Sequence, residues 1–376
     1  MKDQIQEINK RIALVQDPYT DKDLLNSNAI REMKLKNGKL RLLVCLHYPS
    51  DFVSKQIESE LKQRLAGLDF IKAIKITVQS VIKAKQTKNN PVKNIKNIIA
   101  VASGKGGVGK STIAANLAVA LSEAGAKVGL LDADIYGPSQ AQLFSIQHHG
   151  KPAVKDDKYF LPVNVLGVEM MSMALVSPED TPLIWRGPMV SSALQQMLFN
   201  TVWDVLDYLI VDLPPGTGDI HLTLIQKMPL TAAVIVTTPQ DVALLDVQKT
   251  IQMFNKLKVP VIGVIENMSY HECEACHHKS FIFGQGGGKK LKEEFNLNLL
   301  GSLPLSPIVQ RSGESGKPIA STLSLETTGG YKALTEVEES RRVFVANYRD
   351  IAIKTVLGLA ELSDAKAQII DVMYEE

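Results

Sequence analysis

A glycine-rich segment carries the clearest chemical pattern in the sequence. Residues 103–112 read Ser-Gly-Lys-Gly-Gly-Val-Gly-Lys-Ser-Thr and fit the phosphate-loop pattern G-x-x-x-x-G-K-[ST]. Glycines let backbone N–H groups approach phosphate oxygens because no Cβ stands between them. Lys110 can neutralise charge between the β- and γ-phosphates, and the Ser111 hydroxyl can ligate Mg²⁺. The residues expected to hold the nucleotide here are Gly104, Lys105, Gly106, Gly107, Val108, Gly109, Lys110, Ser111 and Thr112.

The residues around this segment have the pattern that a phosphate loop requires. Residues 97–102 are an apolar run of strand length, and residues 113–121 are typical of a helix. A helix in this position directs the positive end of its dipole at a bound anion. A flexible glycine-rich turn without a ligand is the alternative, and the strand–loop–helix order disfavours it.

Acidic residues follow two further strands. Asp132 and Asp134 end the strand at 127–132, and Asp212 ends an apolar strand at 207–212. The carboxyl ends of parallel strands meet at one sheet edge, so these acids should face the phosphate loop. Asp212 is expected to hold a magnesium-bound water. Capping of a following helix is the alternative for the first two acids.

A stiff turn follows Asp212. Residues 213–216 read Leu-Pro-Pro-Gly, and two consecutive prolines restrict the backbone of the turn. We expect the N–H group of Gly216 to contact the γ-phosphate of the nucleotide.

Cys273 and Cys276 form a Cys-x-x-Cys pair after another buried strand. Two thiolates cannot complete a tetrahedral zinc site or a four-iron cluster. Two chains related by a two-fold axis would supply four thiolates. Zinc bound within one chain is an alternative, because flanking histidines could complete the ligand set, and a thiol redox pair is another. The histidines in question are His271, His277 and His278.

Composition excludes several classes of protein. The chain has 376 residues, of which 45% are hydrophobic and 22% charged, and its net charge is +2. Clustered basic excess is absent, so no nucleic-acid partner is expected. No run approaches the roughly 18 apolar residues of a membrane span, and residues 1–10 lack the apolar core of a secretory signal. Three cysteines make no disulfide framework. We therefore expect a cytoplasmic protein without a membrane partner.

The hydrophobic pattern predicts two domains joined by a linker. Residues 1–82 alternate between helical and strand-like segments and form a small α/β domain. Residues 83–96 are polar, basic and broken by proline, which is typical of a linker. Residues 97–376 predict a doubly wound, mainly parallel sheet covered by helices on both faces, with a C-terminal helix after residue 340. The expected strands of this sheet are 97–102, 127–132, 207–212, 232–238, 259–265 and 298–303.

The phosphate loop resembles that of the MinD/ParA/nitrogenase-iron-protein class, in which a second lysine follows the first glycine. The resemblance implies that Lys105 reaches the nucleotide of a partner subunit in a homodimer. It also implies that Asp134 orients the attacking water and that Asn267, after the strand at 259–265, contacts the adenine base.

The run Asp212-Leu-Pro-Pro-Gly-Thr-Gly-Asp219, together with Trp185-Arg-Gly-Pro-Met189, resembles the Mrp/ApbC family of iron–sulfur cluster carrier ATPases. The resemblance covers residues 97–325. It implies slow ATP hydrolysis and a labile [4Fe–4S] cluster that bridges two subunits through Cys273 and Cys276. It further implies transfer to apo iron–sulfur proteins and contact with assembly scaffold proteins. Residues 1–82, with Asp17-Pro18 after their first helix, resemble a MIP18-like domain.

Two other functions remain open on the sequence alone. One is a positioning ATPase of the MinD/ParA type, although the acidic end at residues 371–376 differs from the basic amphipathic helix of a membrane-targeting segment. The other is a zinc-stabilised nucleotide-binding module without cluster transfer.

Overall fold

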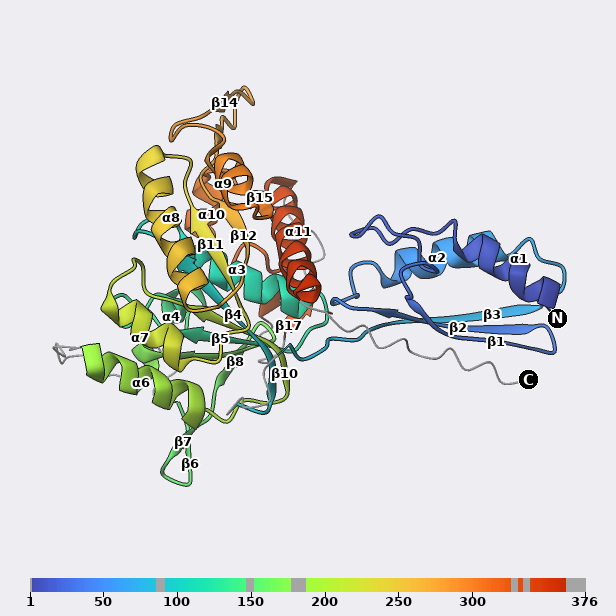
Figure 1. Cartoon of the computed structure of the whole chain (residues 1–376), viewed down its shortest axis with the longest axis horizontal. Helices are drawn as coiled ribbons and strands as arrows, with labels where there is room; N and C mark the ends of the chain where they lie inside the picture. Colours follow the sequence, from blue (N-terminus) through green and yellow to red (C-terminus); the bar gives the residue numbers. More distant parts are fainter. Residues whose placement is uncertain are drawn as a thin grey trace. The chain divides into compact units, whose positions relative to one another are not determined.

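The computed structural model (Figure 1) describes residues 2–85, 92–146, 152–176, 187–325, 331–333 and 339–362. Residues 86–91 of the predicted linker, the Trp185 side of the Trp-Arg-Gly-Pro-Met motif and the acidic C-terminal end lie outside these residues. The contacts divide the chain into two compact units, which are Met1–Lys83 and Ala84–Leu362. No helix in the described ranges combines the length and apolar character needed to cross a bilayer.

The first unit packs two helices on a three-stranded sheet. The order along the chain is α1 (Lys2–Ile12), β1 (Ile30–Lys36), β2 (Lys39–Leu46), α2 (Ser54–Leu65) and β3 (Ala73–Ser80). Strand β2 is central, antiparallel to β1 and parallel to β3. The alternation of helical and strand-like segments expected for residues 1–82 is present. Strand β1 was not predicted.

The interior of this unit contains polar contacts as well as apolar packing. Asp17 is buried and accepts a hydrogen bond of 2.6 Å from the Tyr48 hydroxyl. Cys45 is also buried and accepts a hydrogen bond from the Gln79 amide at 3.4 Å. A small buried side chain is what the position of Cys45 within a strand predicts.

The second unit is built on an eight-stranded sheet with the order β15-β12-β11-β4-β10-β5-β9-β8. All neighbouring strands are parallel except the edge strand β8, which is antiparallel to β9. The predicted doubly wound, mainly parallel sheet is therefore confirmed. The strands are β4 (Ile95–Ser103), β5 (Val128–Asp132), β8 (Val163–Val165), β9 (Val168–Ser172), β10 (Leu206–Asp212), β11 (Ala232–Thr237), β12 (Val261–Glu266) and β15 (Leu299–Ser302).

Helices cover both faces of this sheet. On one face α6 (Gly187–Asn200), α7 (Asp219–Lys227), α8 (Asp241–Lys256) and α9 (Gly287–Phe295) bury a cluster of apolar side chains. On the other face α3 (Lys110–Glu123) packs against β4, β5 and β10, and α11 (Glu339–Glu361) packs on α3 and β15. The short helices α4 (Gln140–Leu143), α5 (Met173–Val176) and α10 (Pro307–Glu314) lie in connections.

Three small antiparallel pairs project from the connections of this unit. They are β6 (Val154–Lys155) with β7 (Tyr159–Phe160), β13 (His271–Glu272) with β14 (Lys279–Ser280), and β16 (Leu323–Leu325) with β17 (Tyr331–Ala333). In Figure 1 the β13–β14 pair projects from the part of the unit that contains α8 and α9.

Candidate functional site

The phosphate loop joins the end of β4 to the start of α3. Its backbone is left-handed at Gly107 (φ 80°) and at Gly109 (φ 83°), which directly precedes α3. Glycine adopts this conformation without the strain that other residues incur. A Cβ on Gly104 would lie 2.5 Å from the carbonyl carbon of Asp246 in α8. The loop glycines are thus required by close backbone packing as well as by access for a phosphate.

Lys110 is the first residue of α3, and its side chain is only 6% exposed. The ammonium forms a short ion pair with Asp212 and lies 3.6 Å from a carboxylate oxygen of Asp134. The structure therefore brings together three of the predicted catalytic residues, which come from the loop and from two strand ends. Because these charges are buried, each would be energetically costly without its oppositely charged partner.

Asp132 and Asp212 lie opposite each other on the neighbouring strands β5 and β10. Gln140 links the two carboxylates, because its backbone N–H donates to Asp132 at 3.1 Å and its side-chain amide donates to Asp212 at 2.7 Å. The same amide donates to the Ser111 carbonyl at 3.0 Å. Asp132 accepts from the first N–H group of α4, whose N-cap residue is Ser139. Asp134 instead faces Lys110.

The electrostatics of the acid cluster follow from burial. Burial raises the pKa of Asp132 to about 7, and the negative charge of Asp212 adds to the shift. Hydrogen bonds from Gln140, Ser172 and the Asp134 backbone oppose it. Burial also raises the pKa of Asp134, while the positive charge of Lys110 acts in the opposite direction.

Lys105 lies outside this cluster. Its ammonium donates a hydrogen bond of 3.1 Å to the side-chain oxygen of Gln240, which also accepts from the Thr238 hydroxyl at 3.1 Å. Gln240 directly precedes α8. The structure thus separates the two loop lysines, with Lys110 buried among carboxylates and Lys105 half-exposed beside α8.

The expected role of Gly216 is corrected by its hydrogen bond. The N–H group of Gly216 donates to the Ser103 carbonyl at 3.0 Å. The turn after Asp212 is therefore fastened to the last residue of β4. The prediction that this N–H group contacts a γ-phosphate is wrong for this conformation.

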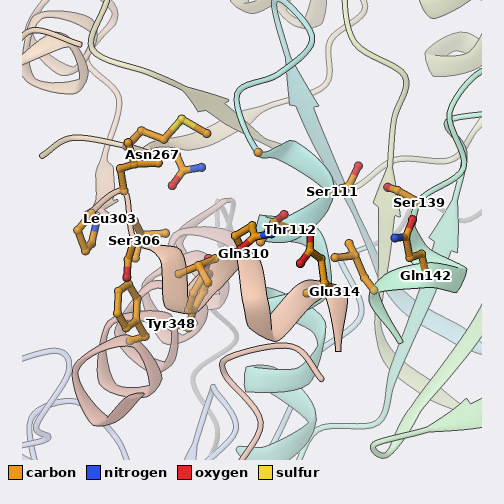
Figure 2. A pocket seen from close by; sticks show the side chains of 18 residues that line it. Ser111, Thr112, Ser139, Gln142, Asn267, Leu303, Ser306, Gln310, Glu314 and Tyr348 are labelled. Carbon is orange, nitrogen blue, oxygen red and sulfur yellow. The ribbon is translucent and has the colours of Figure 1, made fainter. Parts of the chain in front are cut away.

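A cavity of about 350 Å³ adjoins the phosphate loop (Figure 2). Ser111, Ser139 and Gln142 lie at one side of it, and Leu303, Ser306 and Tyr348 lie at the other. Asn267 lines the cavity, and its side-chain amide donates to the Val108 carbonyl at 2.9 Å. Largely apolar walls with a few polar groups next to a phosphate loop suit the base and ribose of a nucleotide.

The cysteine pair lies on the β13–β14 hairpin. The Cys273 N–H donates to the His278 carbonyl at 3.0 Å, and the His277 N–H donates to the Cys273 carbonyl at 2.9 Å. Cys276 is exposed and Cys273 half-exposed. Hydrogen bonds from the backbone N–H groups of Cys276 and Ala275 lower the pKa of Cys273, which favours the thiolate that binds metals.

The flanking histidines do not complete a ligand set within one chain. His277 contacts Glu272 at 3.2 Å, and His271 contacts the Leu305 carbonyl at 3.2 Å. Over the part of the chain that the structure describes, no three His, Cys, Asp or Glu side chains converge as metal ligands. The zinc site within one chain that the sequence left open is therefore not formed in this conformation.

Comparison with known proteins identifies the family. The sequence model of the family described as "NUBPL iron-transfer P-loop NTPase" matches residues 94–338. The chain belongs to this family. A second model, described as "Iron-sulfur cluster assembly protein", matches residues 5–78. Both resemblances drawn from the sequence, to iron–sulfur carrier ATPases and to a MIP18-like domain, are thus confirmed.

Two similar sequences and one similar solved structure illustrate the relationship of this iron-transfer P-loop NTPase to other proteins. A protein of Pseudomonas fragi named "Iron-sulfur cluster carrier protein" is 52% identical over 263 residues, which are 69% of this chain and 91% of the relative. A protein of Escherichia coli with the same name is 41% identical over 328 residues, which are 86% of this chain and 89% of the relative. A solved nucleotide-binding protein of Archaeoglobus fulgidus in complex with ADP is 37% identical. It has a TM-score of 0.55 and covers 61% of this chain and 89% of its own.

Proposed function

We propose that this chain is an ATP-hydrolysing carrier that binds a labile [4Fe–4S] cluster between two copies of itself and transfers it to apo iron–sulfur proteins. The observation on which this proposal mainly rests is the cysteine pair. It supplies two accessible thiol ligands on an exposed hairpin, with no third ligand among the described side chains nearby. A cluster shared by two chains would have four thiolates and an open side, which suits release to an acceptor or loading from a scaffold protein.

The nucleotide half of the proposal rests on the phosphate loop. Lys110 provides a buried cation at the start of a helix, and Asp212 a fully buried carboxylate at the strand end beside it. This charge pair fits the phosphates and the metal of Mg-ATP. The Ser111 hydroxyl would hold Mg²⁺ directly and Asp212 would hold it through water, and the ion would supply charge neutralisation. Asn267 and the adjoining cavity would receive the adenosine part.

The homodimer is supported by exposed apolar side chains on α8 and after the cysteine hairpin. Val242 and Leu245, on the first turns of α8, are 68% and 59% exposed. Phe281 and Ile282, after the cysteine hairpin, are 45% and 58% exposed. A second copy would cover these side chains, and Lys105 would leave Gln240 to contact the partner's nucleotide. Hydrolysis would be slow, with Asp134 orienting the attacking water, because Lys105 must act from the other chain.

Anaerobic reconstitution with iron and sulfide tests the cluster site. The proteins to compare are the wild type, Cys273→Ala/Cys276→Ala and Cys45→Ala, the last being a control for the buried cysteine. We expect about four irons per dimer and broad absorption near 400 nm in the wild type and in Cys45→Ala. The double variant should lose both signals. One zinc per chain, with no iron absorption, would overturn the proposal.

A second measurement tests the link to ATP. Lys105→Ala and Lys110→Ala should retain the iron content of the wild type but lose ATP hydrolysis and transfer to an apo-protein, because both lysines lie apart from the cysteine hairpin. Full transfer by Lys110→Ala would show that the nucleotide is not needed for delivery.

A further inference from the structure

The cysteine hairpin is built directly on the wall of the nucleotide cavity. Past the ends of β12 and β15 the two segments continue side by side. The N–H of Leu303 donates to the Glu266 carbonyl at 2.8 Å, and the N–H of Ser269 donates to the Leu303 carbonyl at 2.9 Å. The N–H of Leu305 donates to the Tyr270 carbonyl at 2.7 Å. This ladder leads from the sheet to the first residue of the hairpin.

The same ladder faces the cavity. Leu303 and Leu305 line it, as does Asn267 on the other segment (Figure 2). The last contact of the ladder joins the His271 ring to the Leu305 carbonyl at 3.2 Å, two residues before Cys273. A nucleoside in the cavity would therefore touch the backbone that carries the entry strand of the hairpin.

The helix that follows the hairpin, α9, is fastened to the same strand end. Glu266 is 5% exposed, and its carboxylate accepts a hydrogen bond of 2.5 Å from the N–H of Gly288 in the first turn of α9. A carboxylate at a helix N-terminus is stabilised by the free N–H groups there. A Cβ on Gly288 would lie 2.7 Å from Leu299 and 3.2 Å from the Glu266 Cβ. This packing requires a glycine at position 288, and Gly284 and Gly286 have positive φ angles of 92° and 78°, which favour glycine. The glycine run at residues 284–288 is therefore explained without a second phosphate loop.

The residue after Glu266 reaches the phosphate loop. The backbone N–H of Asn267 donates to the Thr237 carbonyl at 2.7 Å, and its side chain donates to the Val108 carbonyl at 2.9 Å. The end of β12 thus joins the phosphate loop, the cavity wall, the entry of the cysteine hairpin and the helix that follows the hairpin.

We propose that Glu266 is a positioning residue that makes the geometry of Cys273 and Cys276 depend on the nucleotide bound in the same chain. The hairpin is anchored directly at its entry and, through residues 281–287, at the start of α9. A displacement of the cavity wall therefore reaches the hairpin from both sides. Packed and hydrogen-bonded elements respond in this way because they are not continuously deformable. That the hairpin carries an iron–sulfur cluster rests on the proposed function. The coupling between the nucleotide cavity and the hairpin does not, because it can be measured on protein that holds no cluster.

Hydrogen exchange of the full-length protein without cluster tests the coupling. We compare wild type, Glu266→Ala and Glu266→Gln, each with and without a slowly hydrolysed ATP analogue. In the wild type the analogue should slow exchange at residues 303–305 and also at residues 271–280, by about fivefold or more. Glu266→Ala should keep the first effect and lose the second. Glu266→Gln should retain most of both, because an amide oxygen still accepts from Gly288.

Glu293→Ala is the matched control. This glutamate lies on α9, the helix whose first turn Glu266 contacts, but it is exposed and forms a 3.9 Å ion pair with Lys289. The variant should behave like the wild type. Should Glu266→Ala fail to fold, His271→Phe removes the last contact of the ladder and should weaken the hairpin protection. Equal hairpin protection in Glu266→Ala and wild type, or none in the wild type, would overturn the inference.

The consequence for cargo is measured on the reconstituted protein as the rate at which a chelator removes iron. The analogue should change this rate by about fivefold or more in the wild type, and Glu266→Ala should remove the dependence on the analogue. An unchanged dependence in that variant would contradict the inference. Hairpin protection without any bound iron would instead overturn the proposed function and leave the coupling intact.

Discussion

Lys110 has a structural role as well as its proposed role in catalysis. Its buried ammonium lies between the carboxylates of Asp134 and Asp212, and the latter is fully buried. Removing one partner of a buried ion pair leaves an uncompensated charge, which is more destabilising than the loss of an exposed pair. Variants at this position therefore change stability together with nucleotide binding.

We predict that Lys110→Met lowers the free energy of unfolding of the larger unit by about 3–5 kcal/mol. Adding Asp212→Asn should recover a substantial part of this loss, because it removes the buried charge left unpaired. Urea unfolding followed by tryptophan fluorescence isolates this unit, since both tryptophans, Trp185 and Trp203, belong to it. A double variant no more stable than Lys110→Met would contradict this account.

The raised pKa of Asp132 predicts a pH dependence. The folded state keeps a proton on this carboxyl up to about pH 7, whereas the unfolded chain loses it near pH 4. The folded state binds more protons between these values, so stability should fall as pH rises through this window, by at most about 1.4 kcal/mol per pH unit. Asp132→Asn removes this group, so its stability relative to the wild type should rise from pH 5 to pH 7. If the difference in free energy of unfolding between the two proteins did not change with pH, the raised pKa of Asp132 would be contradicted.

At the scale of elements, the phosphate loop is packed against α8 through one glycine. We predict that Gly104→Ala destabilises the nucleotide-free larger unit by about 1–3 kcal/mol, because the new Cβ would overlap the backbone at Asp246. Gly106→Ala is the matched control, since its Cβ would meet only Pro215, at 3.8 Å. It should change stability by about 0.5 kcal/mol or less. Similar urea midpoints for the two variants would mean that the contact with α8 is unimportant.

The sequence predicted the buried elements well and the edge elements poorly. Strands β4, β10 and β11 are almost wholly buried, and their unbroken apolar runs are distinctive. Strand β1 has an exposed, charged pattern and was missed. The β8–β9 hairpin was missed as well, although Leu166 and Gly167 (φ 50° and 74°) form its tight turn.

Within the site, sequence reasoning found residues with recognisable chemistry. It predicted that Lys110, Asp134 and Asp212 meet at one sheet edge, and in the structure Lys110 contacts both carboxylates there. It missed Gln140 and Glu266, because a glutamine or glutamate after a turn or strand has no distinctive pattern. Their importance comes from contacts with residues far away in the sequence, which only the folded chain displays.

At the scale of the whole molecule, the proposed dimer predicts complementation between inactive variants. Lys105→Ala and Lys110→Ala should each lack ATP hydrolysis. After mixing under conditions that exchange subunits, about half of the dimers should be mixed and have one complete site out of two. About a quarter of the wild-type activity should then return. Activity in Lys105→Ala alone, or none in the mixture, would argue against action of Lys105 on the partner's nucleotide.

The hydrogen bond between Lys105 and Gln240 has a consequence for the protein concentration at which dimers form. An isolated chain already satisfies this ammonium, so two chains without nucleotide must break the bond at both sites and gain no phosphate contact in return. A hydrogen bond to a charged group contributes about 1.5–3 kcal/mol, and tenfold in an equilibrium constant is about 1.4 kcal/mol. Dilution should therefore separate the nucleotide-free chains long before it separates the ATP-bound ones, and a cell that makes little of this protein would assemble it only when ATP is present.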